Sequence, residues 1–264
     1  MPSLKSQGAA FVLALVVLPA SAATARLLIF GEQHDQPDQQ RQVAAEVQAL
    51  AAHGQLAAVV LEMAEQPHRT SALPRDASES AVRDALQWKG WPWEPYAAVA
   101  MNAVRAGVPV LGGNLPRADM RAAMADTALD ARVDDAVRSL LADAVRSGHC
   151  ELLPAAQLPG MVRIQIARDQ AMAQVTAEAV RDAPAGSTVL LLVGAQHASR
   201  DRGVPRHLAA IDATLSMRVV MFGEASSGLA ADERRPAVHT PQEDHCEALR
   251  KRLAAPPAAS APPR

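Results

Sequence analysis

The fold of this chain is decided by residues 27–35, LLIFGEQHD, in which an apolar run passes directly into a glycine, an acid and an imidazole. A second apolar run, VLLLV at 189–193, is followed by GAQH at 194–197. Short apolar runs bounded by glycine are typical of strands that are buried on both faces of a parallel sheet. Both runs end in the pattern G-x-x-H, so the sequence predicts a histidine, His34 or His197, at the end of each strand.

Two histidines at equivalent strand ends indicate a functional site. In open α/β sheets, ligands bind outside the carboxyl ends of the strands. A single G-x-x-H is a weak pattern, and either histidine could instead cap a helix or hydrogen-bond a loop carbonyl. The repetition of the pattern favours a functional role for His34 and His197.

Further apolar runs alternate with segments of helical periodicity. An alternation of strands and crossover helices is typical of βαβ units with a parallel sheet. The sequence therefore predicts an α/β fold with a mainly parallel sheet flanked by helices. The predicted strands are 26–30, 57–61, 108–111, 188–193 and 218–222, and the predicted helices include 39–53, 97–106, 117–147 and 158–181.

Polar residues follow each predicted strand. They are Glu32, His34, Glu62, Asn114, His197 and Glu224. Because the carboxyl ends of parallel strands meet at one edge, we expect these side chains to gather there. Two histidines with carboxylates form a ligand set for zinc, iron or manganese, and a metal-bound water would serve hydrolysis. Without a metal, the same groups could act as general acid and base, or only satisfy the strand ends.

Composition limits the class of protein. With 264 residues, 49% of them hydrophobic, the chain can bury a full core in one large domain or at most two. It carries 26 Lys and Arg against 28 Asp and Glu, so no field of one sign would steer it to nucleic acid. We therefore expect no nucleic-acid partner.

The first 23 residues have the pattern of a secretory signal peptide. Lys5 precedes an apolar run at 9–18, and small residues follow at 20–23. The run is too short to span a bilayer as a helix, and no cysteine follows it that could be acylated. The sequence predicts export to the periplasm without a lipobox cysteine and with no stable membrane span after cleavage.

Two cysteines, Cys150 and Cys246, remain after the predicted cleavage. A disulfide between them is plausible in an oxidising compartment, but spacing alone does not show that their Cα atoms come within reach. The pairing stays open at this point.

The aromatic residues are concentrated in one stretch. All three tryptophans, Trp88, Trp91 and Trp93, and the only tyrosine, Tyr96, lie within residues 88–96. Such a cluster either plugs the core or lines a pocket for a flat, amphipathic ligand. Burial tendencies alone favour core packing.

Several motifs together resemble the ChaN family of exported haem-binding proteins, which belongs to a superfamily with TraB, Tiki metalloproteases and erythromycin esterases. The resemblance covers about residues 27–223 in order. Its motifs are GEQHD at 31–35, LEM at 61–63, the stretch 88–96, GNLPR at 113–117, QxxRDxxMA at 165–173, GxxH at 194–197 and GVP at 203–205.

The resemblance implies a parallel-sheet core with an attached helical lobe, and haem held between the two, with two subunits sharing it. It also implies a tyrosine as haem ligand with an assisting histidine, and Tyr96 is the only tyrosine of this chain. On this reading, Tyr96 ligates the iron, Trp88, Trp91 and Trp93 wall the pocket, and His34 and His197 lie beside it. The chain departs from the family at Gln39 and Gln40, where further histidines are common.

The predicted organisation has three parts. They are a signal peptide at 1–23, a haem-binding α/β domain at 24–226 with a helical lobe at about 64–100 and 117–175, and a tail at 227–264 that is largely disordered after 254. Beyond residue 226 the strand and helix patterns dissolve, because Ala, Pro and Ser near the end bury too little surface.

Three functional hypotheses follow. The first is a periplasmic haem-binding protein of haem or iron uptake, with an outer-membrane haem receptor as partner and a homodimer as its assembly. The second is a metal-dependent hydrolase, an esterase or protease, which uses zinc or manganese at Glu32, His34, Glu62 and His197. The third is a scaffold whose site is vestigial.

Overall fold

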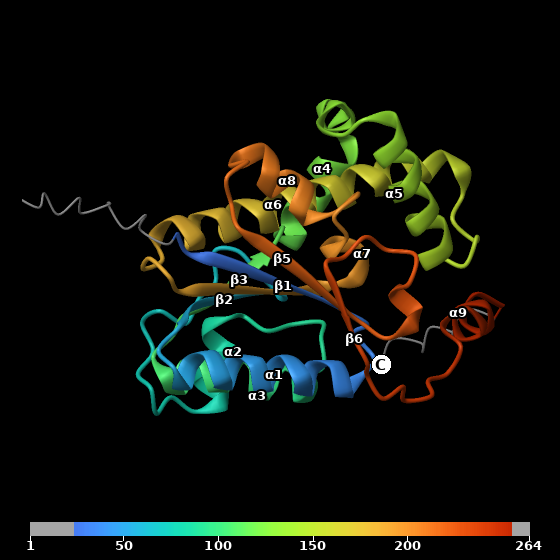
Figure 1. The fold of residues 1–264 in the computed structure, drawn as a ribbon. Helices are drawn as coiled ribbons and strands as arrows, with labels where there is room; N and C mark the ends of the chain where they lie inside the picture. The colour runs from blue at the N-terminus through green and yellow to red at the C-terminus, as the bar shows by residue number, and fades with distance from the viewer. Residues whose placement is uncertain (1–23, 255–264) are drawn as a thin grey trace, which may run out of the picture.

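The computed structural model describes residues 24–254 (Figure 1). The predicted signal peptide at 1–23 and the end of the tail, 255–264, lie outside the described residues.

The core of the molecule is a six-stranded sheet in which every neighbouring pair of strands is parallel, as the sequence predicts. The strand order is β3-β2-β4-β1-β5-β6, so β1 lies between β4 and β5 in the middle of the sheet. The strands are β1 Arg26–Glu32, β2 Leu56–Glu65, β3 Val110–Asn114, β4 Thr188–Gly194, β5 Met217–Phe222 and β6 Glu233–Arg235.

Three helices cover the lower face of the sheet in Figure 1: α1 Pro37–Ala52, α2 Glu79–Ala85 and α3 Glu94–Ala106. Helix α1 begins with a proline, which is suited to a first helical position, and buries Val43 and Val47 on one face. The sequence prediction assigns residues 64–100 to the helical lobe. Instead, α2 and α3 belong to the core beneath the sheet, and α3 packs against α1.

The opposite face is covered by α6 Leu158–Asp182, α7 Ala195–Ala198 and α8 Val204–Ile211. Met172 of α6 and Leu208 of α8 pack there against alternate strand residues such as Ile29 and Leu191. The strands are therefore buried on both faces, which explains their nearly continuous apolar sequences.

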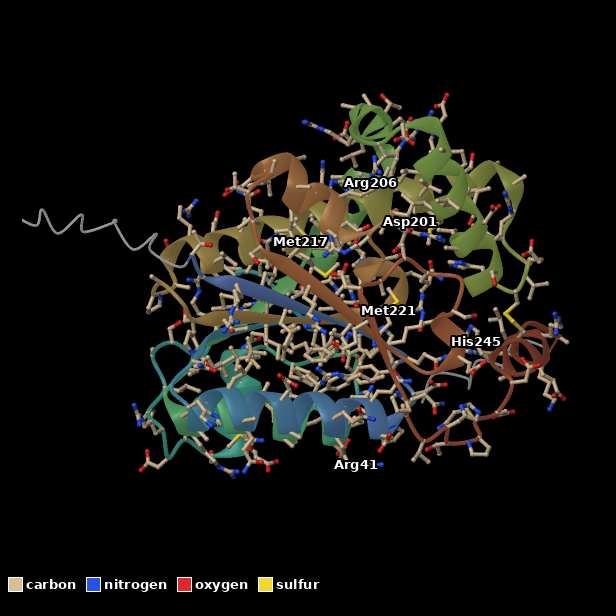
Figure 2. All side chains as sticks on the ribbon, viewed as in Figure 1. Arg41, Asp201, Arg206, Met217, Met221 and His245 are labelled. Atoms are coloured by element: carbon tan, nitrogen blue, oxygen red, sulfur yellow. A yellow bond between two sulfur atoms is a disulfide. The ribbon has the colours of Figure 1, made fainter. Side chains whose placement is uncertain are left out.

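A separate helical lobe extends beyond one end of the sheet. It consists of α4 Met120–Ala125, a 3-10 turn Thr127–Arg132, α5 Asp135–Gly148 and the first half of α6, around a small core of its own. The Asp134 carboxylate caps α5 by accepting the Val137 N–H at 2.9 Å. Asp134 also pairs with Arg206 of α8 at 3.0 Å, and the arginine points toward the lobe in Figure 2.

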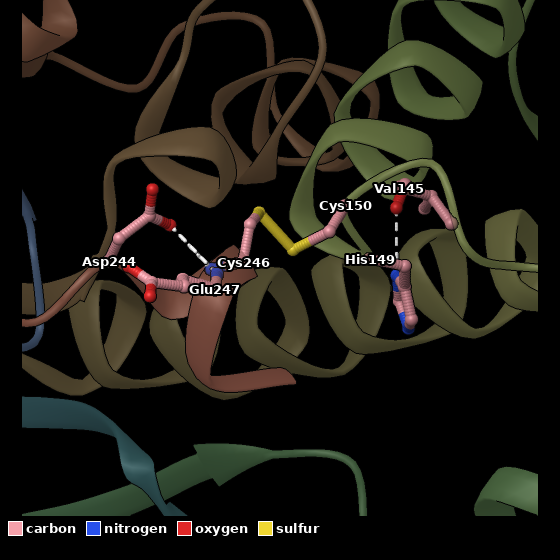
Figure 3. The surroundings of a disulfide bond; sticks show 6 residues. All are labelled: Val145, His149, Cys150, Asp244, Cys246 and Glu247. Atoms are coloured by element: carbon pink, nitrogen blue, oxygen red, sulfur yellow. Dashed lines mark hydrogen bonds between the residues drawn. A yellow bond between two sulfur atoms is a disulfide. The ribbon is translucent and has the colours of Figure 1, made fainter. Parts of the chain in front are cut away.

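The segment after residue 226 contains two elements that the sequence patterns do not predict. Strand β6 extends the sheet beside β5, and α9, His245–Ala254, follows it. Cys246 in α9 forms a disulfide with Cys150, with Cα atoms 5.3 Å apart, so the plausible pairing is present (Figure 3). Across residues 24–254, no helix combines the length and apolar character that crossing a membrane requires.

Candidate functional site

The two G-x-x-H segments meet because β1 and β4 are neighbours. Their register pairs Glu32 with Gly194, so His34 and His197 both follow the same edge of the sheet. The expectation that distant strand ends converge is met for these two histidines and for Glu62, which lines the same pocket.

The pocket at this edge has a volume of about 460 Å³, and we call it the strand-end pocket. Its floor comes from the ends of β1, β2 and β4, and its opposite wall from α5 and α6 of the lobe. The lining includes Glu32, His34, Glu62, Trp91, Leu141, Ala144, Val145, His149, Gln165, Arg168, Gly194, His197 and Leu229. The pocket thus combines apolar lobe residues with imidazoles.

Glu62 is the electrostatic centre of the floor. Its carboxylate accepts the Gly194 N–H at 2.6 Å and pairs with Arg168 Nη2 at 2.5 Å. Asn114 braces this pair, since its Oδ1 accepts Arg168 Nε at 3.0 Å and its Nδ2 donates to the Glu62 carbonyl at 2.9 Å. Burial raises the pKa of Glu62, but the charges of His197, Arg168 and His34 outweigh it and lower the pKa to about 2.

Gly194 has no room for a side chain. A Cβ there would lie 2.9 Å from His34 Nε2 and 3.4 Å from Glu62 Oε2. The glycine of the second G-x-x-H therefore allows the first histidine and the Glu62 carboxylate to approach the backbone closely.

His34 is the most exposed of the predicted site residues that gather on the floor, with 31% of its side chain accessible. Its Nδ1 hydrogen-bonds Glu32 Oε1 at 2.9 Å, while Nε2 lies 3.9 Å from Glu62, too far for a hydrogen bond. In the neutral form of the ring, the carboxylate partner assigns the proton to Nδ1 and leaves Nε2 with a free electron pair. Burial lowers the pKa of His34, but Glu32 and Glu62 outweigh it, so the pKa is raised.

Glu32 is buried and shared among three side chains. It accepts hydrogen bonds from Tyr96 at 2.7 Å, from His34 and from Gln40. Burial raises the pKa of Glu32 more than these hydrogen bonds lower it, so the pKa lies above its usual value. Gln39 and Gln40, which stand where the family commonly has histidines, also fix the backbone of Gln33, through its N–H and carbonyl respectively.

Tyr96 is not placed to ligate iron. Its side chain is 0% exposed in the core beneath the sheet, and its hydroxyl donates to Glu32. Burial and the neighbouring Glu32 carboxylate raise the pKa of the phenol far above its usual range, which disfavours the phenolate that iron would need. The prediction of a Tyr96 ligand is therefore corrected: the phenol supports Glu32.

The three tryptophans divide between core and pocket. Trp88 packs edge-on against Trp93, with ring centroids 5.0 Å apart, and both are buried in the core around Tyr96. Trp91 alone lines the strand-end pocket, with its ring 4.5 Å from the His34 ring. The predicted pocket wall is therefore reduced to Trp91, because the other two rings are enclosed by packing.

His197 faces the same floor from α7, the short helix that follows β4. Its Nδ1 bonds the buried Asp169 carboxylate at 2.6 Å, and its Nε2 lies 3.7 Å from Glu62 Oε1. Asp169 and Arg168 were visible in the sequence only as part of the 165–173 motif. The acid partner fixes the ring orientation of His197 at the back of the pocket.

The structure does not support the alternative of a zinc or manganese centre. Within residues 24–254, no group of three or more His, Cys, Asp or Glu side chains is arranged to hold a metal ion. The carboxylates are already committed, Glu32 to Tyr96 and Gln40, and Glu62 to Arg168 and Gly194. Glu224 is exposed and lines a different pocket, beside β6.

Sequence reasoning missed one histidine of the pocket. His149 ends α5 and lines the lobe wall of the strand-end pocket. The only signal in the sequence is its position between Gly148, at the end of a helical pattern, and Cys150. Without the placement of the lobe, that signal does not indicate a site.

Comparisons with known proteins agree with this architecture. The ChaN of Campylobacter jejuni, described as binding haem cofacially, superposes with a TM-score of 0.63 over 76% of this chain and 82% of that chain, at 23% identity. This likeness shows the fold. A protein of Bacillus cereus gives a TM-score of 0.40 at 13% identity over 76% of this chain and 66% of that chain, which carries no argument.

No curated protein matches the chain. A family model matches residues 18–208, and its description is "Haem-binding uptake, Tiki superfamily, ChaN". The match covers most of the sequence, from before the first strand to α8. The chain therefore belongs to the ChaN family of haem-binding uptake proteins in the Tiki superfamily.

Proposed function

We propose that this chain is an exported protein of haem or iron uptake that holds haem in the strand-end pocket, between the sheet edge and the helical lobe. Membership of the family is the reason for proposing haem as the ligand. The observation that carries the location is a single pocket lined both by a histidine with a free Nε2 and by apolar side chains of the lobe.

The residues of this pocket fit the chemistry of haem. Leu141, Val145 and Leu229 offer apolar surface for the porphyrin, and Trp91 offers an aromatic wall beside His34. The volume of about 460 Å³ lies within the range of small-molecule sites, roughly 300–1,000 Å³. Haem, when bound, supplies an iron centre with axial positions for protein ligands.

His34 is the residue of the pocket floor that we assign to the iron. Its Nε2 carries the free electron pair, and its Nδ1 is held by Glu32. A carboxylate behind a histidine fixes the tautomer and ring orientation and makes the other nitrogen a better ligand. Glu32 in turn is oriented by hydrogen bonds from Tyr96 and Gln40. The buried tyrosine therefore contributes to the site indirectly, by positioning the carboxylate that holds His34.

Titration of the purified protein with haemin, followed by absorbance, tests this proposal. We expect saturable binding, a loss of at least tenfold in affinity in His34→Ala, and loss of binding in Ala144→Trp, whose indole would fill the pocket. Ala136→Trp is the matched control, because Ala136 is an exposed residue of the same helix. Equal haem binding by both tryptophan variants would contradict the location.

Export is supported by the signal-like sequence before residue 24 and by the Cys150–Cys246 disulfide, a bond that persists in oxidising compartments. We therefore place the mature protein in the periplasm. Fractionation of cells that express the full chain, with N-terminal sequencing of the product, checks this. A cytoplasmic protein that retains residues 1–23 would contradict it.

The assembly that we propose is a homodimer, with an outer-membrane haem receptor as the source of haem. The cofacial haem binding described for the Campylobacter protein supports a dimer, since face-to-face haems can be brought together by two copies. Light scattering with and without haemin measures the mass, and a monomer under both conditions would contradict the dimer. Copurification with a receptor from solubilised outer membranes tests the partner.

A further inference from the structure

We propose that residues 236–246 form a clasp between the two walls of the strand-end pocket, and that reduction of the Cys150–Cys246 disulfide opens this clasp and speeds the release of haem. The partner that opens it belongs to the chemical class of dithiol reductants. The inference rests on the proposed haem site and concerns its regulation. The clasp adds no ligand to the iron.

One end of the clasp lies along the loop that follows His34. The buried side chain of Gln36 exchanges two hydrogen bonds with the backbone of Thr240: Nε2 donates to the carbonyl at 3.0 Å, and Oε1 accepts the N–H at 2.8 Å. Three more hydrogen bonds of 2.8 to 2.9 Å continue this contact: Gln242 Nε2 to the Asp35 carbonyl, Val238 N–H to the Asp38 carboxylate and Gln42 Nε2 to the Pro236 carbonyl. The clasp is therefore fixed to the sheet side of the pocket.

The other end of the clasp is bonded covalently to the lobe. Figure 1 shows the segment after β6 passing the start of α1 and reaching α9 beside the lobe. There Cys246 is joined to Cys150, which directly follows the pocket residue His149 at the end of α5 (Figure 3). Asp35 likewise directly follows the pocket residue His34. The clasp thus holds each wall one residue away from the pocket lining.

The wall that the clasp holds is α5, which lines the pocket with Leu141, Val145 and other residues. The lobe has a core of its own, in which α5 packs against α6. At the start of α5, Asp134 pairs with Arg206, but both side chains are exposed, and exposed ion pairs contribute little stability. The disulfide is therefore the stronger of these two ties at the ends of α5.

The turn beside the disulfide favours opening once the bond is reduced. Cys150 and Glu151 both have left-handed backbone conformations, with φ of 58° and 59°. Non-glycine residues adopt this region only where their surroundings impose it. The bond from Cys150 to α9 is such a restraint. Without it, the two residues can return to ordinary backbone conformations, and the end of α5 can move away from α9.

The two sulfur atoms differ in their access to a reductant. Cys150 is only 5% exposed, whereas Cys246 is half-buried. A thiolate of the reductant therefore attacks Sγ of Cys246, and the Cys150 thiolate leaves. The second thiol of the reductant attacks the mixed disulfide and releases Cys246. The reductant loses two electrons and two protons and becomes a disulfide, and the chain gains two thiols.

Hydrogen–deuterium exchange of the haem-free chain, with and without dithiothreitol, tests the clasp independently of haem. After reduction we expect faster exchange at the end of α5 and in residues 238–242, while β4 keeps its protection. Unchanged exchange would mean that the disulfide does not hold the lobe. Equally faster exchange in β4 would mean general unfolding. Either result overturns the inference and leaves the proposed haem site standing.

The effect on haem is measured by the rate of haemin transfer to excess apomyoglobin, followed by absorbance. We expect transfer from the unmodified chain to become at least tenfold faster with dithiothreitol. The double variant Cys150→Ser and Cys246→Ser should transfer haemin at the fast rate with and without the reductant. Arg206→Ala is the matched control, because it removes the tie at the other end of α5, and its rate should stay within twofold of the unmodified chain.

Equal transfer rates from the oxidised and the reduced unmodified chain overturn the inference. An acceleration of the same size in the double variant also overturns it, because the reductant would then act on the haem itself. Absence of haemin binding by the oxidised unmodified chain overturns the proposed haem site together with the inference.

Discussion

The hydroxyl of Tyr96 donates a hydrogen bond of 2.7 Å to Oε1 of Glu32, and both side chains are buried at the end of β1. The same Glu32 oxygen holds Nδ1 of His34. The phenol therefore acts on the pocket through the carboxylate that orients the histidine, and not through contact with a ligand.

The first prediction concerns Tyr96→Phe. Removal of a buried hydrogen bond to a carboxylate should lower the free energy of unfolding by about 2 kcal/mol. The spectrum of the haemin complex should keep the same ligands, because the ring lies outside the pocket lining. Chemical denaturation and absorption spectroscopy measure the two effects. A spectrum that loses an axial ligand would restore Tyr96 as iron ligand.

The second prediction concerns Gly194→Ala. The new Cβ would meet His34 Nε2 at 2.9 Å, so the imidazole must move away from its present position. The backbone at Gly194, with φ −59° and ψ 148°, accepts any residue, and the effect is therefore one of contact. We expect at least a tenfold loss of haem affinity and a loss of about 1 kcal/mol in stability.

Gly228→Ala is the control for this substitution, because no atom lies within 4 Å of a Cβ at that position. Haemin titration and thermal unfolding of both variants measure the effects. Equal affinities of the two variants would show that His34 does not need its present position.

The third prediction concerns the contribution of Glu62 to the stability of the protein at different pH values. Its pKa is lowered from 4.5 to about 2 in the folded protein. A depressed pKa contributes stability above the unfolded value, and that contribution disappears as the pH falls from about 4.5 through about 2. The difference in pKa corresponds to about 3 kcal/mol at neutral pH.

Glu62→Gln should therefore be less stable than the unmodified chain at pH 7, and the gap should narrow as the pH approaches 2. Loss of the charge also leaves Arg168 without its buried partner, which adds to the cost at neutral pH. Urea denaturation at several pH values measures the gap. A gap that stays constant over this range would mean that Glu62 has an ordinary pKa.

The fourth prediction concerns the pH dependence of haem binding. In the proposed haem site, only neutral His34 offers Nε2 to iron, and Glu32 and Glu62 raise the pKa of His34 above 6.5 despite burial. Haem affinity should thus be highest above the raised pKa of His34 and should decrease as the pH falls through that pKa. In the ligand-free protein the sign is opposite: protonated His34 stabilises the fold below pH 6.5, and this contribution is lost as the pH rises through the folded pKa.

The variant Glu32→Gln tests whether the charge of Glu32 causes the raised pKa of His34. The amide keeps the shape of the carboxylate but removes the charge that raises the pKa of His34, so the midpoint of haem release should move to lower pH. The overall affinity should also fall, by roughly 10- to 100-fold, because the histidine loses its carboxylate partner. Haemin titrations across pH, with NMR of the His34 ring in the ligand-free protein, measure both. An unshifted midpoint would contradict the role of Glu32.

The sequence predicts strands β1 to β5 because each of them has mostly apolar residues that are buried in the sheet. The run at 189–193 is apolar at every position, and β4 is buried throughout. The two histidines converge because the Glu32–Gly194 register follows from parallel pairing of β1 with β4. The fold class and the convergence of His34 and His197 therefore follow from the sequence without knowledge of the full strand order.

The role of Tyr96 could have been found from periodicity. Tyr96, Val99, Ala100 and Ala103 recur with helical spacing, and all are 0% exposed in α3. That pattern places the tyrosine on the core face of a helix. The resemblance to a family with a tyrosine ligand led to the opposite assignment, whereas the local residues indicate burial.

The C-terminal elements could not be predicted in the same way. Strand β6 is Glu233–Arg234–Arg235, an edge strand without an apolar face, and it depends on its ladder with β5 and on the Arg235–Glu46 ion pair at 2.9 Å. The Cys150–Cys246 pair is 96 residues apart and needs α9 to lie beside the lobe. These features depend on contacts between segments that are distant in the sequence, and no local sequence pattern predicts such contacts.

The location of haem is tested most directly by a crystal structure of the haemin complex, with the iron located from its anomalous scattering. We predict an iron peak in the strand-end pocket, within bonding distance of His34 Nε2 and on the side of the sheet edge that faces α5. An iron peak elsewhere on the molecule, with the strand-end pocket empty of haem, would contradict the account.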